Sequence, residues 1–273
     1  RSPPGLTALT EYADGMIEHD AVVGTLLKSL DDMGIADNTI VIYTTDNGPH
    51  QNTWPDAGTT PFRSEKNTNW EGAFRVPALI RWPGHIKPDS VANGMVSGLD
   101  WFPTLMAAVG DTDIKERLLA GTTIDGKTYK NHLDGFNQLP YLTGASDQSA
   151  RNEFFYFNDD GEMVALRYEN WKVVFEEQRA EGTLNIWAEP FTKLRVPRLF
   201  DLRADPYERA SITSNTYFDW LFDHIFLLSA AQAEAGAFLA TFKEFPPAQR
   251  PAGHHPGHRR QRPERGRPAR VRP

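Results

Sequence analysis

A carboxylate and an amide side chain, Asp46 and Asn47, are adjacent in the chain, directly after the apolar run at residues 39–45 and before Gly48. The β-branched residues of that run predict a strand, and α/β sheets bind their ligands beyond the carboxyl ends of strands. Carboxylate and amide oxygens are ligands that Ca²⁺ and Mg²⁺ prefer. The pair therefore predicts part of a divalent-cation site. The alternative is a plain turn, because Asp-Asn-Gly is also a common turn sequence.

A polar segment follows this pair and reads TPFRSEKNTNWEGAFRVP at residues 60–77, continuing as ALIRWPG at residues 78–84. Together with the Asp-Asn pair, these residues closely resemble the sulfatase family. Further matching motifs occur in order, as LDWFPTL at 99–105, DGFNQLPYLTG at 134–144 and LFDLRADPYER at 199–209. Ordered motifs over such a length make coincidence improbable.

The resemblance implies specific roles for three residues. In sulfatases the Asp-Asn pair binds the catalytic cation, so Asp46 and Asn47 are expected to be metal ligands for Ca²⁺ (or Mg²⁺). A lysine before the Glu-Gly-x-x-Arg-Val-Pro run contacts the sulfate, which makes Lys66 the expected catalytic residue. Its ammonium would place positive charge on a sulfate oxygen or on the departing ester oxygen. The alternative for Lys66 is a solvated loop lysine paired with Glu65.

Several neighbouring residues are expected to support this site. Glu71 and Arg75 are interpreted as a buried ion pair or clamp that fixes the direction of Lys66. His50 is interpreted as a histidine that supports the direct contacts or lies in a loop, and Trp54 as an indication of an aryl or sugar ring in the substrate. The implied reaction is metal-dependent hydrolysis of a sulfate ester, with a small molecule as the partner.

The nucleophile that the family requires is a formylglycine made from a Cys or Ser in a Cys/Ser-x-Pro-x-Arg motif. The chain has no cysteine, and the only approach to the motif, Ser2-Pro3-Pro4-Gly5, lacks the arginine. We therefore expect the formylglycine in a missing N-terminal part and little or no turnover by this chain alone. Two rival interpretations stay open, namely a related phosphoester hydrolase and a non-catalytic or decayed sulfatase-fold product.

Composition limits the remaining functions. The net charge is −7, although the final 24 residues contain eight Arg and one Glu. The rest of the chain is therefore strongly acidic, and we do not expect it to bind nucleic acid. No apolar run is long enough to span a membrane. The basic tail at 248–273 is expected to be disordered. It is interpreted as a possible frameshift near Ala248, with an anion-binding arm as the alternative. Compartment and oligomeric state are not predicted.

The pattern of elements predicts an α/β fold. We expect a helix at 9–30, strands at 39–45 and 75–81, a short helix to Val109 capped by Asp100, an antiparallel meander over 154–175 and a final helix at 216–242. By resemblance, residues 1–150 would be the C-terminal part of the catalytic domain, in an alkaline-phosphatase-like sandwich with a mixed sheet and flanking helices. Residues 151–247 would form a small antiparallel-sheet-and-helix C-terminal subdomain. Such a divided sheet would expose apolar faces, so the isolated chain is expected to aggregate or bind hydrophobic dyes.

Overall fold

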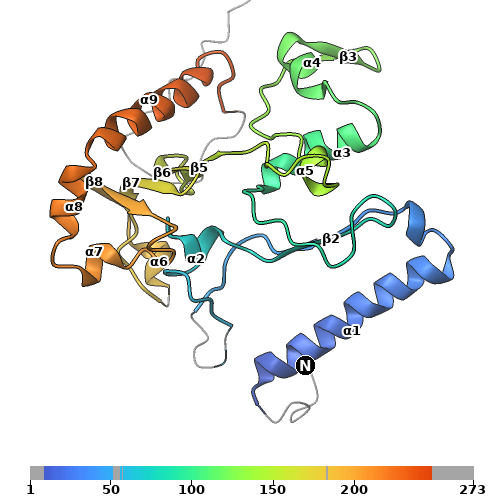
Figure 1. The fold of residues 1–273 in the computed structure, drawn as a ribbon, viewed down its shortest axis with the longest axis horizontal. Coiled ribbons are helices and arrows are strands. Elements are labelled where there is room, and N and C mark those ends of the chain that lie inside the picture. Colours follow the sequence, from blue (N-terminus) through green and yellow to red (C-terminus); the bar gives the residue numbers. More distant parts are fainter. Residues whose placement is uncertain (1–8, 52–55, 57, 183, 248–273) are drawn as a thin grey trace, which may run out of the picture.

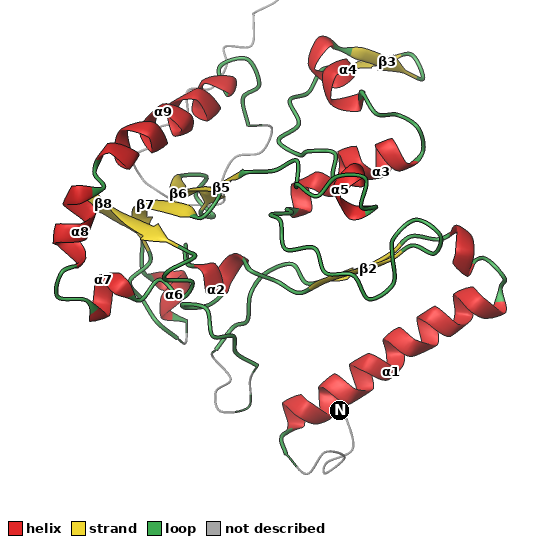
Figure 2. Cartoon of the chain, in the orientation of Figure 1, coloured by secondary structure: helices red, strands yellow, loops and turns green. Residues whose placement is uncertain are grey.

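The computed structural model describes residues 9–51, 56, 58–182 and 184–247, and it is a mixed α/β structure of small antiparallel sheets with helices around them (Figures 1 and 2). The expected segments at 2–5, around Trp54 and at 248–273 lie wholly or mainly outside these residues. No helix among the described residues is long and apolar enough to cross a membrane.

The first part of the chain is a long helix followed by a strand pair. Helix α1 (Glu11–Asp32) begins after Thr10, whose hydroxyl oxygen accepts a hydrogen bond from the Ala13 amide at 3.1 Å and so caps the helix. After a 3₁₀ turn, η1 (Ala36–Asn38), strand β1 (Val41–Thr44) pairs antiparallel with β2 (Ala78–Arg81). Figure 1 shows α1 at the periphery, away from the larger sheet. Both strands confirm the expected elements, although they are shorter than expected.

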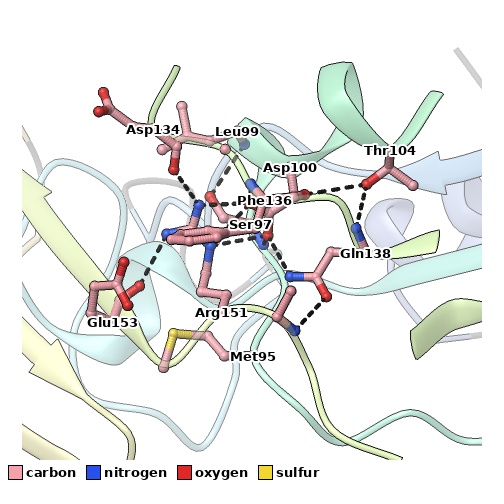
Figure 3. Close-up of polar contacts among 12 residues, drawn as sticks. Met95, Ser97, Leu99, Asp100, Thr104, Asp134, Phe136, Gln138, Arg151 and Glu153 are labelled. Atoms are coloured by element: carbon pink, nitrogen blue, oxygen red, sulfur yellow. Dashed lines mark hydrogen bonds and ion pairs between the residues drawn. The ribbon is translucent and has the colours of Figure 1, made fainter. Parts of the chain in front are cut away.

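The middle of the chain is held by a buried ion pair (Figure 3). Arg151 contacts both carboxylate oxygens of Asp100, at 2.6 Å and 3.0 Å, and the Phe136 amide and the Gln138 side chain donate to the same carboxylate. The elements of this region are η2 (Gly98–Asp100), α3 (Trp101–Ala108), α4 (Ile114–Ala120), β3 (Thr122–Ile124), β4 (Lys127–Tyr129) and α5 (Leu139–Leu142).

Asp100 lies at the N-cap of α3, as expected, but its side chain does not cap that helix. Its carboxylate makes no capping hydrogen bond to α3. It accepts instead from the Ser97 amide at 2.9 Å, and it lies fully buried against Arg151. A buried carboxylate needs a charged partner, and the arginine that supplies it is distant in the sequence.

A four-stranded antiparallel meander forms the larger sheet, in the order β5-β6-β7-β8. Its strands are β5 (Glu153–Phe157), β6 (Met163–Tyr168), β7 (Trp171–Glu177) and β8 (Thr192–Asp201). The first three strands confirm the expected meander, and β8 extends it. One core cluster joins Trp70 to Tyr156, Val174 and Phe200, so the segment before α2 (Glu71–Phe74) packs on this sheet.

The other core cluster joins the sheet to the C-terminal helices through Leu166, Leu199, Tyr217 and Leu221. These helices are α7 (Ala210–Thr213), α8 (Tyr217–Asp223) and α9 (Phe226–Thr241), while the short α6 (Asn185–Ala188) lies between β7 and β8. The single final helix expected at 216–242 is wrong, because the chain leaves helical geometry at His224. The His224 ring nitrogen Nδ1 lies 2.8 Å from the Trp220 carbonyl oxygen and closes the end of α8.

Candidate active site

The Asp-Asn pair lies where expected, immediately beyond the end of β1. Asp46 is exposed, and its Oδ1 accepts from the Thr45 hydroxyl at 3.3 Å. Asn47 is half-buried, and its side-chain nitrogen donates to the Gly48 carbonyl at 2.8 Å. Because the amide nitrogen is engaged in this way, the Oδ1 of Asn47 is the side-chain atom suited to a cation. The local geometry thus presents two oxygen donors from adjacent residues.

Backbone hydrogen bonds attach this turn to the segment at residues 60–77, which carries Lys66 and is called the lysine segment below. The Gly48 amide donates to the Ala73 carbonyl at 2.7 Å, and the Lys66 amide donates to the Pro49 carbonyl at 2.9 Å. A Cβ atom at Gly48 would overlap the carbonyl oxygen of Gly72, so only glycine permits this close approach. Lys66 is therefore anchored to the loop that starts at the Asp-Asn pair, although the two are about twenty positions apart in the sequence.

The donors present fit a hard cation in type, and they fill only part of its coordination. Ca²⁺ takes six to eight oxygen ligands. Among the described residues, no group of three or more acidic, histidine or cysteine side chains could hold a metal ion. Asp46 and Asn47 would therefore supply two ligands, and the others would have to come from water, from the substrate or from residues outside those described.

Glu65, the proposed alternative partner of Lys66, is almost fully buried and is occupied by other groups. Its two carboxylate oxygens accept from the Gln51 amide at 2.6 Å and from the Gly182 amide at 2.8 Å. The His50 Nε2 atom lies 3.9 Å from the same carboxylate. Glu65 therefore links its own segment to the loops that carry Gln51 and Gly182. Lys66 is half-buried, and its Nζ lies 5.8 Å from the centroid of the Trp187 ring.

A buried charge cluster at the start of α2 is defined by Glu71, Lys172, Glu208 and Tyr156. The Lys172 ammonium contacts Glu71 Oε1 at 3.1 Å and Glu208 Oε1 at 2.8 Å, and both carboxylates are almost inaccessible to solvent. The Tyr156 hydroxyl donates to Glu71 at 2.6 Å. The expected Glu71–Arg75 ion pair is present as well, at 2.8 Å. This cluster joins α2 to β5, β7 and the turn before α7.

The cluster shifts its two carboxyl groups in opposite directions. Burial alone would raise the pKa of Glu71, but Lys172, the Tyr156 hydroxyl and Arg75 outweigh it and lower that pKa to about 2. Burial raises the pKa of Glu208, an effect that Lys172 opposes and the Glu71 carboxylate reinforces. Lys172 thus favours the ionised form of both carboxyls, whereas burial and the neighbouring Glu71 carboxylate hold the pKa of Glu208 above its ordinary value.

Sequence reasoning did not find Lys172 or Trp187. Strand alternation offered one signal, because Lys172 shares the sheet face of Val174, which is fully buried. A lysine within an apolar strand is usually an edge or surface residue, and its two acidic partners lie far away in the sequence. Trp187 gave no signal because its segment carries no motif.

Comparison with known proteins identifies the family. Residues 5–111 match the model described as Sulfatase, and residues 149–253 match the model described as the C-terminal region of aryl-sulfatase. The chain belongs to the sulfatase family. This sulfatase chain is 34% identical to human (Homo sapiens) arylsulfatase A over 212 residues, which cover 74% of this chain and 38% of that protein. It is 32% identical to mouse (Mus musculus) steryl-sulfatase, over 74% of this chain and 33% of that protein.

A solved structure supports the same relationship. A sulfatase from Pseudoalteromonas sp. superimposes with a TM-score of 0.69 and 31% sequence identity. The match covers 87% of this chain and 44% of that one. The sulfatase chain described here therefore spans less than half the length of these relatives.

Proposed function

We propose that this chain is the C-terminal part of a metal-dependent sulfuric ester hydrolase of the arylsulfatase type. In this proposal Asp46 and Asn47 are two of the cation ligands, and Lys66 contacts the sulfate. The observation that supports it best is the 2.9 Å hydrogen bond from the Lys66 amide to Pro49, because it holds the lysine beside the loop that carries the expected ligands.

The residues of this chain would bind and orient the substrate. A Ca²⁺ ion, when bound, supplies positive charge to the sulfuryl oxygens. Lys66 adds a compact point charge that interacts with a sulfate oxygen or with the ester oxygen as negative charge develops on it. Glu65 and the buried cluster around Glu71 hold the backbone on both sides of Lys66, which fixes where that charge lies.

We further propose that the chain does not hydrolyse sulfate esters by itself. Its 273 residues contain neither a cysteine nor a complete Cys/Ser-x-Pro-x-Arg motif. The formylglycine would therefore have to be supplied by sequence outside these residues, together with the remaining cation ligands.

Calorimetric titration of the purified chain with inorganic sulfate, in the presence of Ca²⁺, tests the assigned roles. Lys66→Met is expected to weaken sulfate binding about fivefold, since one short-range charge at a partly exposed site contributes about 1 kcal/mol. Asp46→Ala should weaken Ca²⁺ binding measured separately. Lys243→Met and Asp159→Ala, which change exposed residues of the same types, are the matched controls.

Unchanged sulfate affinity in Lys66→Met would contradict the role of Lys66. A second assay tests inactivity, with 4-nitrophenyl sulfate as the substrate. Release of nitrophenol by the pure chain, abolished by Asp46→Ala, would overturn the claim that this chain alone lacks turnover.

A further inference from the structure

A cavity of about 230 Å³ lies between the lysine segment and strands β7 and β8, and we call it the arginine cavity. Asp46, Asn47 and Lys66 do not line it. At about 30 Å³ per water molecule, its volume suits several waters or one small anion rather than a drug-sized ligand. Five charged side chains line it, namely Arg63, Arg179, Arg198, Glu177 and Glu181.

Arg63 is held in a fixed orientation at one wall of this cavity. Its guanidinium carbon lies 3.4 Å from the centroid of the Trp70 ring, and that indole is only 2% exposed. One face of the guanidinium is therefore covered by an aromatic ring. Its Nη1 atom donates to the Glu208 carbonyl at 3.1 Å. Among the described residues no acceptor contacts its Nε or Nη2 atom, so these donors remain available to a ligand in the cavity.

Glu177, the buried carboxylate of the cavity, engages only part of the other two arginines. It accepts from Arg198 Nε at 2.7 Å and from Arg179 Nε at 2.8 Å. The Arg198 Nη2 atom adds a longer contact of 3.3 Å. A guanidinium carries further N–H donors on its two terminal nitrogens. Within the part of the chain that the structure describes, the remaining donors of Arg179 and Arg198 have no recorded acceptor.

The cavity has more positive than negative charge on its walls. Burial lowers the pKa of Arg63, and the charge of Arg198 acts in the same direction, although the carboxylates of Glu208 and Glu177 oppose both effects. An anion between the arginines would reduce the repulsion among them. Guanidinium groups also match the oxygens of sulfate and phosphate, because they can donate two parallel hydrogen bonds to them.

We propose that the arginine cavity binds one tetrahedral oxyanion, sulfate or phosphate, at a site separate from Lys66. This inference goes beyond the proposed function and does not depend on it. The structural alternative is that the arginines serve only as ion-pair partners of Glu177. The two contacts from Arg198 already balance that carboxylate, so Arg63 and Arg179 are in excess. Glu181 does not neutralise them fully, because it is exposed and its charge is screened by solvent.

Calorimetric titration of the Lys66→Met chain without Ca²⁺ tests the inference, with inorganic sulfate and inorganic phosphate as the probes. Removing both Lys66 and the cation removes the binding assigned to the proposed sulfate site, so the sulfate that still binds is assigned to the cavity. We expect one ion per chain and competition between the two probes. Nitrate, which is planar and singly charged, should bind about fivefold more weakly than sulfate.

Two exposed residues on the wall of the cavity should change this affinity in opposite directions. In the same Lys66→Met background, Arg179→Met should weaken sulfate binding about fivefold, whereas Glu181→Lys should strengthen it about threefold. Both variants should keep the melting temperature of the parent chain, since neither position is buried. Arg195→Met, which removes an exposed arginine of β8 that does not line the cavity, is the matched control and should leave the affinity unchanged.

Three results would overturn the inference. They are the absence of saturable sulfate and phosphate binding, an unchanged affinity in Arg179→Met, and an equal loss of affinity in Arg179→Met and Arg195→Met. The last result would mean that the anions are attracted by surface charge in general. Failure of the proposed function is visible separately, because wild-type chain with Ca²⁺ would then bind sulfate no more tightly than Lys66→Met does.

Discussion

At the scale of single residues, the site combines side chains that the sequence reveals with side chains that it hides. Asp46, Asn47 and Lys66 were singled out because each belongs to a short local motif, and their roles in the site stay predictions. Lys172 and Glu208 could not be predicted as partners, because their 2.8 Å contact joins positions that only the folded sheet brings together. The sequence shows which residues carry charge, whereas long-range pairing decides which charges are buried.

A pH-dependent stability follows from the buried cluster. A carboxyl whose pKa is raised on folding, as for Glu208, stabilises the fold below its usual pKa of 4.5, and this contribution is lost as the pH rises through the raised value. The pKa of Glu71 is instead lowered on folding, so its contribution to stability is present above pH 4.5 and is lost as the pH falls toward about 2.

Glu208→Gln should therefore become more stable relative to the wild-type chain as the pH rises above 4.5. Each unit by which the pKa is raised corresponds to about 1.4 kcal/mol. Urea unfolding at several pH values measures the difference, with the exposed Glu189→Gln as the control. A difference between wild type and Glu208→Gln that does not vary with pH above 4.5 would contradict the assignment.

At the scale of elements, local patterns located the strands well and the helix ends less well. The meander was predictable because its turns at 158–161 and 169–170 separate apolar runs. The final helix was predicted as one piece because apolar spacing continues across its break. The break at His224 depends on where α8 packs against the sheet through Tyr217 and Leu221, which periodicity does not reveal.

The close approach of Gly48 to the Gly72 carbonyl, in the turn after β1, leads to a prediction at the scale of elements. Gly48→Ala places a methyl group against the Gly72 carbonyl, so we expect a loss of about 1–3 kcal/mol in the free energy of unfolding. Displacement of the turn should also weaken Ca²⁺ binding. Gly24→Ala, which adds a methyl group to α1 in open space, is the control and should stabilise the chain by up to about 1 kcal/mol. Similar stability losses in both variants would disprove the close approach.

At the scale of the whole molecule, the described chain has one well-packed region and one sparsely covered region. The larger sheet buries side chains on both faces. Helix α1 instead exposes large apolar side chains on several sides, including Ile17 at 47%, Val22 at 54% and Leu26 at 63%. The sequence predicted a helix here, but a sequence pattern cannot show which of its apolar side chains another part of the structure covers.

The exposed apolar side chains of α1 lead us to expect dye binding by the purified chain. The purified chain should bind a hydrophobic dye such as anilinonaphthalene sulfonate, because contiguous exposed apolar surface is unusual for a stable monomer. Replacing both Val22 and Leu26 with Lys should reduce the dye signal at least twofold, whereas Val109→Lys, at a position outside α1 that is 79% exposed, should leave it nearly unchanged. A monomer that melts cooperatively and binds no dye would contradict this prediction and favour an independent module.

The bonds that attach α6 to the lysine segment also bear on how such a site can diversify. The Asn67 side chain donates to the Ile186 carbonyl, which every residue type provides, and the Glu65 side chain accepts from the Gly182 amide, which every type except proline provides. Substitutions at the exposed positions of this segment therefore leave its attachment to Lys66 intact. If Lys66 binds sulfate as proposed, single mutations at these exposed positions would change the surface beside it without altering the bonds that hold it.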